Sequence, residues 1–208
     1  KSLGNAIDPI EIIDMFGLDQ IRYFLLREIT FGSDGDFSIH ALKSRINADL
    51  SNDLGNLCQR SLTMIEKKLN SVIPELKSEA LNNNLISMYA NIIKDASLLV
   101  DSHKLHEYIK LVWSYVNEVN KFFNDNKPWE LFDKDIDKFS EILALTAESI
   151  KKIAFLINPI MPDTSNKILN MLGVRIENFS FEQEELTLIG GNNLGEINHL
   201  FSRIDHDN

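Results

Sequence analysis

The sequence predicts a mainly α-helical protein, in which a small mixed helical unit precedes a bundle of four or five helices. Apolar residues recur at spacings of three and four along much of the chain, as they do in helices that bury one face. Pro9 and Pro162 stand where two of these segments begin, a position that proline favours. The clearest apolar stripe lies on the first long helix and comprises Leu50, Leu54, Leu57, Cys58, Ser61 and Ile65.

The composition is that of an ordinary soluble protein. The chain has 208 residues, of which 44% are hydrophobic and 25% are charged. It contains no apolar run long enough to cross a membrane and no signal peptide. Its one cysteine, Cys58, excludes an internal disulfide and a cysteine-based zinc site, so a cytoplasmic location is expected.

The charge limits how the protein could hold nucleic acid. A net charge of −10 argues against a bulk electrostatic attraction to phosphates. If the chain binds RNA, a few placed side chains must provide the contacts, or another part of the protein must provide a positive surface.

Residues 1–38 are expected to form the small unit. Asp8 can cap a short helix that starts at Pro9 and ends near Gly17. A second helix begins around Leu18, with Arg22 expected on its surface in an ion pair. A turn-rich break follows at 31–36.

Residues 39–173 are expected to form the bundle, with Ser38 as the cap of its first helix. On the second long helix, the expected buried stripe comprises Ile86, Tyr89, Ile93, Ala96 and Val100. Residues 174–208 have no strong period and are expected to pack back on the bundle as a tail. The expected helices cover about 39–69, 79–102, 103–124, 138–157 and 162–172.

Three side chains stand out as candidates for binding RNA. Asn56 and Arg60 are four residues apart on the solvent side of the first long helix, so they are neighbours. An amide beside a guanidinium suits hydrogen bonding to the edge of a nucleobase. Trp129 follows Pro128 in a polar loop, where an indole could stack on a base. The alternatives are a solvated helix face and a tryptophan that covers the core.

Other features give weaker signals. Lys1 and Ser2, close to Gly4, could hold phosphate oxygens, or they could be a terminus without a role. His103 and His106 lie three apart on an expected helix, but no third ligand is evident, so no metal site is predicted.

Several segments resemble methionyl-tRNA synthetases of class I. Lys1 to Asn5 is similar to the second half of the lysine-serine signature loop of class I synthetases. The first helix of the bundle resembles the start of the family's anticodon-binding domain. Ser202 departs from the proline expected in the last motif. The segments that carry the resemblance are Ile7 to Pro9, Asp19 to Glu28, Phe31 to Ser38, Asn47 to Asn56, Pro159 to Pro162 and Leu200 to Ile204.

The resemblance implies a role for each candidate residue. Lys1 corresponds to the loop lysine that contacts the phosphates of ATP and stabilises the transition state of adenylate formation. Asn56 and Arg60 correspond to the residues that bind the anticodon, and Trp129 to the tryptophan on which an anticodon base stacks. ATP and Mg²⁺ are implied for the parent enzyme and methionine tRNA, initiator and elongator, as its partner.

The resemblance also implies that this chain is the C-terminal part of a methionine–tRNA ligase that recognises the CAU anticodon. The catalytic domain before the loop is missing, so the chain alone is expected to be inactive. No further domain follows residue 204, so a monomer is expected. Two alternatives remain: a synthetase for leucine, isoleucine, valine or cysteine, and a helical interaction domain that does not bind RNA.

Overall fold

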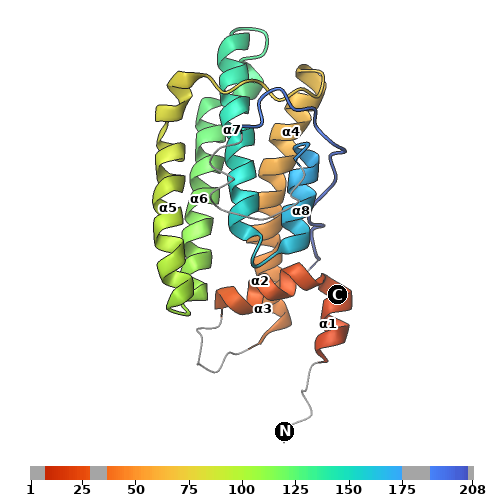
Figure 1. Cartoon of the computed structure of the whole chain (residues 1–208). Coiled ribbons are helices and arrows are strands. Elements are labelled where there is room, and N and C mark those ends of the chain that lie inside the picture. The colour runs from red at the N-terminus through yellow and green to blue at the C-terminus, as the bar shows by residue number, and fades with distance from the viewer. Residues whose placement is uncertain (1–7, 29–36, 175–187, 206–208) are drawn as a thin grey trace, which may run out of the picture.

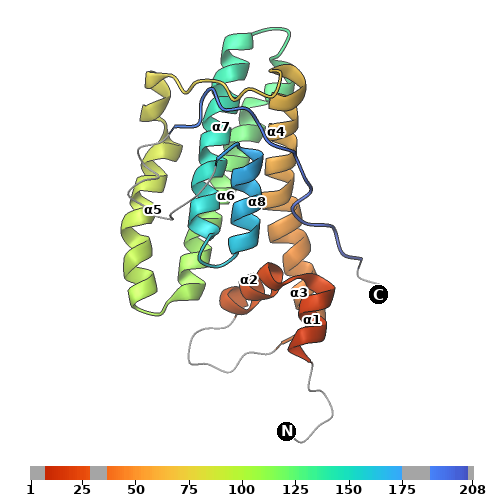
Figure 2. The ribbon, with the colours of Figure 1, turned by 45° about the vertical axis from the view of Figure 1, so that its right-hand side comes forward.

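A computed structural model describes residues 8–28, 37–174 and 188–205. Figures 1 and 2 show an elongated helix bundle with a small helical unit at one end. The prediction of a mainly α-helical fold is confirmed. Within the described ranges there is no strand, and the only β-type pairing is an isolated antiparallel bridge between Val72 and Asn193.

The small unit consists of two short helices joined by a glycine. Helix α1 (Pro9–Phe16) is capped by Asp8, whose carboxylate accepts a hydrogen bond from the Ile10 N–H at 2.9 Å. It ends at Gly17, whose φ of 91° is a conformation that side chains other than glycine rarely adopt. Helix α2 (Leu18–Glu28) follows at once and packs against the lower end of the bundle (Figure 2).

The first long helix of the bundle is continuous, but it changes type in the middle. Helix α3 (Ile39–Arg45) leads into a π-helical segment, η1 (Ile46–Gly55), and then into α4 (Asn56–Lys68). The predicted extent and the Ser38 cap are both confirmed. The predicted stripe is buried, with every member at most 2% exposed. The periodicity did not indicate the π segment, because its apolar side chains still reach the core.

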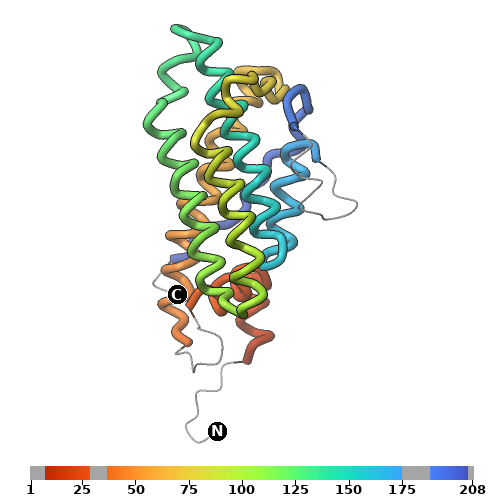
Figure 3. The backbone as a smooth tube through the Cα atoms, turned by 60° about the vertical axis from the view of Figure 1, so that its left-hand side comes forward, coloured from red at the N-terminus to blue at the C-terminus, as the bar shows by residue number. Residues whose placement is uncertain are grey.

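Helices α5 (Asn84–Asp101) and α6 (Leu105–Asn126) form an antiparallel pair beside α7 (Figure 3). A short 3₁₀ turn, η2 (Ser78–Asn82), precedes α5, which Asn83 caps. The predicted stripe on α5 is confirmed at Tyr89 and Ala96, whereas Ile86 and Ile93 are only partly buried. The side chains that α5 buries are Leu85, Tyr89, Ile92 and Ala96, whereas Val100 is 47% exposed.

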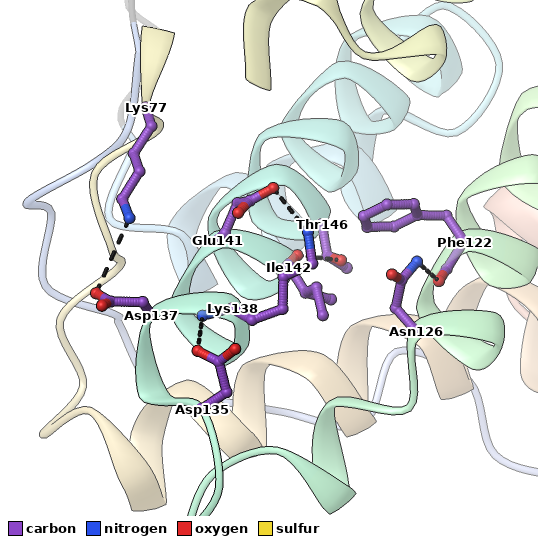
Figure 4. Close-up of polar contacts among 9 residues, drawn as sticks. All are labelled: Lys77, Phe122, Asn126, Asp135, Asp137, Lys138, Glu141, Ile142 and Thr146. Atoms are coloured by element: carbon purple, nitrogen blue, oxygen red, sulfur yellow. Dashed lines mark hydrogen bonds and ion pairs between the residues drawn. The ribbon is translucent and has the colours of Figure 1, made fainter. Parts of the chain in front are cut away.

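Helix α7 (Ile136–Ile157) is the centre of the bundle and contacts α4, α5, α6 and α8. Its start is fixed by Asp135, whose carboxylate accepts from the Lys138 N–H at 2.9 Å, while Lys138 also pairs with Glu141 (Figure 4). From Ile142 to Ile157 every residue is buried. This run includes the polar residues Thr146, Glu148, Ser149, Lys151 and Lys152. The buried charges of Glu148 and Lys151 are paired with each other at 2.6 Å.

Helix α8 (Pro162–Met171) runs back along the bundle, and the tail lies over it. The tail also pairs with the linker before α5, since the Ile73 N–H donates to the Asn192 carbonyl at 2.9 Å. Gly173 has a φ of +68°, and a Cβ atom there would collide with the Asn193 carbonyl. A glycine is therefore required where the tail crosses the end of α8.

Candidate nucleic-acid interface

Arg60 lies half-buried on α4 between two aromatic rings. Its Cζ is 5.1 Å from the ring centroid of Phe123 and 5.1 Å from that of Trp129. Its Nη1 donates a hydrogen bond to Oδ1 of Asn124 at 3.0 Å. Both Phe123 and Asn124 come from the last turn of α6. The guanidinium is thus held at a fixed place by cation–π contacts and one hydrogen bond.

Trp129 reaches this place through a tight turn at the end of α6. Lys127 adopts the left-handed conformation with a φ of 44°, which costs a residue with a side chain about 1–2 kcal/mol. The chain then enters a 3₁₀ turn, η3 (Pro128–Glu130), which carries the indole. The indole packs edge-on against Phe123 with ring centroids 6.0 Å apart, yet it remains 44% exposed. Its position is therefore fixed while much of its surface faces solvent.

Asn56 is exposed one helical turn before Arg60 and borders a cavity of about 540 Å³. One side of this cavity is formed by Ser51, Asn52 and Gly55 of η1 and by Asn56 and Gln59 of α4. Its other wall is the tail segment 199–203. Its size lies within the range of small-molecule pockets, about 300–1,000 Å³.

The structure brings Arg60 and Trp129 into direct contact and places Asn56 on the neighbouring turn. Lys1 lies outside the described residues. Phe123 is fully buried, and its contact with Arg60 was not predicted from the sequence. Asn124 lies in the last turn of α6, and nothing in the sequence pointed to its bond with Arg60. The tail wall gave no local signal, because it depends on contacts more than a hundred residues apart in sequence.

Acidic groups lie close to this surface. Burial and the nearby carboxylate of Asp49 raise the pKa of Asp53 to about 6. The backbone carbonyl of Asp53 accepts from Nδ2 of Asn120 at 3.1 Å, which ties η1 to α6. At neutral pH Asp53 is ionised, one helical turn before Asn56.

The described residues offer no metal site and no membrane span. They contain no group of three or more His, Cys, Asp or Glu side chains that could hold a metal ion. The expected placement of His103 and His106 on one helix was wrong. His103 lies in the turn before α6, whereas His106 lies on the helix. No helix among the described residues has the length and apolarity that a membrane span requires.

Comparison with protein families decides between the class I groups considered above. Residues 1–62 match the family of class I tRNA synthetases (M). Residues 77–208 match the anticodon binding domain of methionyl tRNA ligase. The chain belongs to the methionyl-tRNA synthetase family. The alternatives of a leucine, isoleucine, valine or cysteine enzyme are therefore set aside.

Relatives of this family match nearly the whole chain. The methionine–tRNA ligase of Caldanaerobacter subterraneus subsp. tengcongensis is 40% identical over 99% of the chain, which spans 33% of that protein. The enzyme of Rickettsia conorii is 35% identical over 99% of the chain, which spans 42% of that protein. The chain thus covers between a third and a half of these relatives.

Solved structures of methionyl-tRNA synthetase from Mycobacterium tuberculosis share the fold. The free form has a TM-score of 0.89 at 33% identity. The matched region covers 96% of this chain and 41% of the chain in that structure. The complex with methionyl-adenylate has a TM-score of 0.90 at 34% identity. The matched region covers 97% of this chain and 41% of the chain in that structure. The arrangement of α1 to α8 is therefore that of methionyl-tRNA synthetases.

Proposed function

We propose that this chain recognises the CAU anticodon of methionine tRNA, as part of an enzyme that joins methionine to tRNA. The observation that carries the proposal is the Arg60–Trp129 pair. A fixed guanidinium lies beside a part-exposed indole, and the exposed amide of Asn56 is one turn away. This combination offers both stacking and hydrogen bonding to unpaired bases, which is how proteins read single-stranded RNA loops.

Each of the three side chains has a distinct part in this proposal. Trp129 offers the exposed part of its indole for stacking. The bond to Asn124 uses one of the five N–H donors of Arg60, and among the described residues Asn124 is its one hydrogen-bonding partner. Arg60 can therefore still donate to a base edge. Asn56 can both donate and accept, and the cavity beside it gives room for a base.

The proposal extends to the complete enzyme. It would activate methionine with ATP and Mg²⁺, release pyrophosphate and transfer the methionyl group to tRNA. Lys1 would place an ammonium against the ATP phosphates, where charge develops during adenylate formation. The preceding catalytic domain would provide the methionine site, so this chain alone would not catalyse the reaction.

A cytoplasmic location and a monomeric state also stay predictions. Light scattering of the purified protein would test the monomeric state.

The test is binding of RNA hairpins, measured by fluorescence anisotropy at low salt. One hairpin carries CAU and the other has one anticodon base changed. We expect the wild-type protein to prefer CAU, and Trp129→Ala and Asn56→Ala to abolish the preference. Asn91→Ala, which removes an exposed amide from α5, is the matched control and should leave it unchanged.

Two results would contradict the proposal in different ways. Equal, salt-sensitive binding to both hairpins would show that the surface holds RNA without reading the anticodon. No binding to either hairpin would favour the remaining alternative, a helical domain that interacts with proteins and not with RNA.

A further inference from the structure

The polar side chains of α2 attach the small unit to the bundle. The first is Asp19, which is only 5% exposed. Its Oδ2 accepts hydrogen bonds from the backbone N–H of Thr164 at 2.7 Å and from the Thr164 hydroxyl at 2.8 Å. Thr164 is in the first turn of α8, where backbone N–H groups have no partner within the helix. Met161, which precedes α8, provides no side-chain cap. Asp19 is therefore the cap of α8, although it lies 145 residues earlier in the chain.

Arg22 makes the complementary contact one turn later on α2. Its Nε donates to the carbonyl of Ile160 at 2.6 Å, and its Nη2 donates to the carbonyl of Pro159 at 2.9 Å. Both carbonyls belong to the turn that follows the C-terminus of α7. Arg22 is exposed as expected, but its partners are backbone carbonyls and not the carboxylate of an ion pair. A cation at the end of α7 and an anion at the start of α8 each match the local helix dipole.

Other side chains of α2 bind the long helix. The Tyr23 hydroxyl donates to Oδ2 of Asp49 at 2.6 Å, and Glu28 pairs with Arg45 at 2.6 Å. Helix α2 is thus bound both to the α7–α8 turn and to the long helix that carries Asn56 and Arg60. Figures 1 and 2 show α2 at one end of the bundle, while the loop that carries η3 lies at the other end.

We infer that Asp19 and Arg22 are positioning residues that fix the orientation of the α1–α2 unit relative to the bundle. In the sequence, Lys1 stands directly before this unit. Arg60 and Trp129 lie on the bundle, away from the end at which the unit packs. A fixed contact between the α1–α2 unit and the bundle would therefore set the distance between the proposed ATP-binding residue and the proposed anticodon-binding residues. The consequence for tRNA charging rests on the function proposed above, whereas the geometric consequence does not.

A distance measurement between spin labels tests the joint directly in this chain. Labels are attached at Met15→Cys on α1 and Ile136→Cys at the start of α7, which are 61% and 48% exposed in the wild type. Cys58 can stay, because burial raises the pKa of its thiol to about 12 and makes it unreactive. We expect one narrow distance distribution in the wild type and a broader one in Asp19→Ala and in Asp19→Ala/Arg22→Met.

Two variants separate positioning from general damage. Asp19→Asn keeps an oxygen that can accept from Thr164, and its amide nitrogen would take the place of Oδ1, which has no partner among the described residues. It should restore the narrow distribution. Asp14→Ala removes an exposed carboxylate from α1 and should change nothing. A wild-type distribution in the double variant would overturn the inference, whatever the protein does with RNA.

The second arm uses the full-length enzyme and two reactions. We expect Asp19→Ala to lower kcat/KM for tRNA charging about tenfold or more, because small misalignments are costly in catalysis. Methionine-dependent pyrophosphate exchange and binding of the CAU hairpin should stay within about twofold of wild type, and Asp19→Asn should restore charging. Equal loss of both reactions would show general damage and overturn the inference. A wild-type enzyme that neither charges tRNA nor binds the hairpin would refute the proposed function, while the distance result would stand.

Discussion

Asn47 holds Ile204 through both atoms of its side-chain amide. Its Oδ1 accepts from the Ile204 N–H at 2.8 Å, and its Nδ2 donates to the Ile204 carbonyl at 2.7 Å. Asn47 is 7% exposed and lies in η1, so a single side chain anchors the tail to the π-helical segment. The anchor lies next to the tail residues that form the outer wall of the cavity beside Asn56.

Replacing Asn47 with alanine should release this part of the tail. The loss of both bonds should lower the free energy of unfolding by about 1–3 kcal/mol. Urea denaturation measures this change, and faster cleavage of the tail in limited proteolysis should accompany it. Asn52→Ala, at an exposed position in the same segment, should stay within about 0.5 kcal/mol of wild type. An equal loss in both variants would mean that the two bonds contribute little.

Arg60 and Trp129 should depend on each other in binding RNA. Trp129→Ala should weaken binding of the CAU hairpin by about 1–3 kcal/mol, which is typical for the loss of one stacked base. Because the guanidinium lies over the indole, the loss in Arg60→Ala/Trp129→Ala should differ from the sum of the single losses by about 0.5–3 kcal/mol. A double-mutant cycle by anisotropy measures this coupling. Strict additivity would show that the contact has no role in binding.

Asp53 should make the stability of the protein depend on pH. Its pKa in the folded protein is about 6, above that of the unfolded chain. A raised pKa means that the folded state holds the proton more tightly, so this contribution is fully present below about pH 4 and is lost as the pH rises through 6. Asp53→Asn removes the titration. Its Tm should match that of wild type near pH 4 and exceed it at pH 7.5.

The matched control for this effect is Asp125→Asn, which removes an exposed carboxylate near the end of α6. Its difference in Tm from wild type should not vary across the same pH range. A constant difference for Asp53→Asn as well would contradict the assignment of the titration to Asp53.

The isolated chain should not form methionyl-adenylate. The proposed methionine site belongs to the catalytic domain that precedes Lys1, so the purified chain should show no methionine-dependent exchange of pyrophosphate into ATP. The full-length protein, assayed in parallel, is the positive control. Exchange catalysed by the chain alone would place a complete active site within its 208 residues.

Lys1 should matter for adenylate formation and not for binding the anticodon. In the full-length protein, Lys1→Met should slow methionine-dependent pyrophosphate exchange at least about a hundredfold, as expected when a group that stabilises developing charge is removed. Binding of the CAU hairpin should be unchanged. An exchange rate close to wild type would remove Lys1 from the proposed site.

The sequence predicted the helices well because their boundaries are encoded locally. Asp8 and Ser38 each cap a helix within a few residues, and Pro9 and Pro162 occupy first helical positions. The Asp135 cap was not predicted, and the expected start of α7 was two residues late. The buried stripe on α4 was also predictable, since it follows the helical period. On α5 the pattern failed in part, because both Ile92 and Ile93 are apolar and periodicity alone does not decide which one faces the core.

The candidate site was less predictable because its contacts join distant parts of the chain. Periodicity placed Asn56 and Arg60 on one side of a helix, but it could not reveal that Arg60 packs on Phe123 and Trp129. The contacts of Asp19 with Thr164 and of Asn47 with Ile204 were likewise hidden, since each joins residues more than a hundred positions apart. Such contacts depend on tertiary packing, which a single sequence does not display.

The burial of α7 along almost its whole length has a consequence for how motions in this protein can be measured. Backbone amides in a helix surrounded by four others exchange with solvent only when the whole bundle opens. The slowest-exchanging hydrogens of α7 therefore report the global free energy of unfolding. Amides in α1, α2 and the tail that exchange faster must do so through smaller openings. The exchange rates of the α7 amides can thus serve as an internal reference. In one exchange experiment they separate a local change in protection, caused by a substitution or by RNA, from a change in global stability.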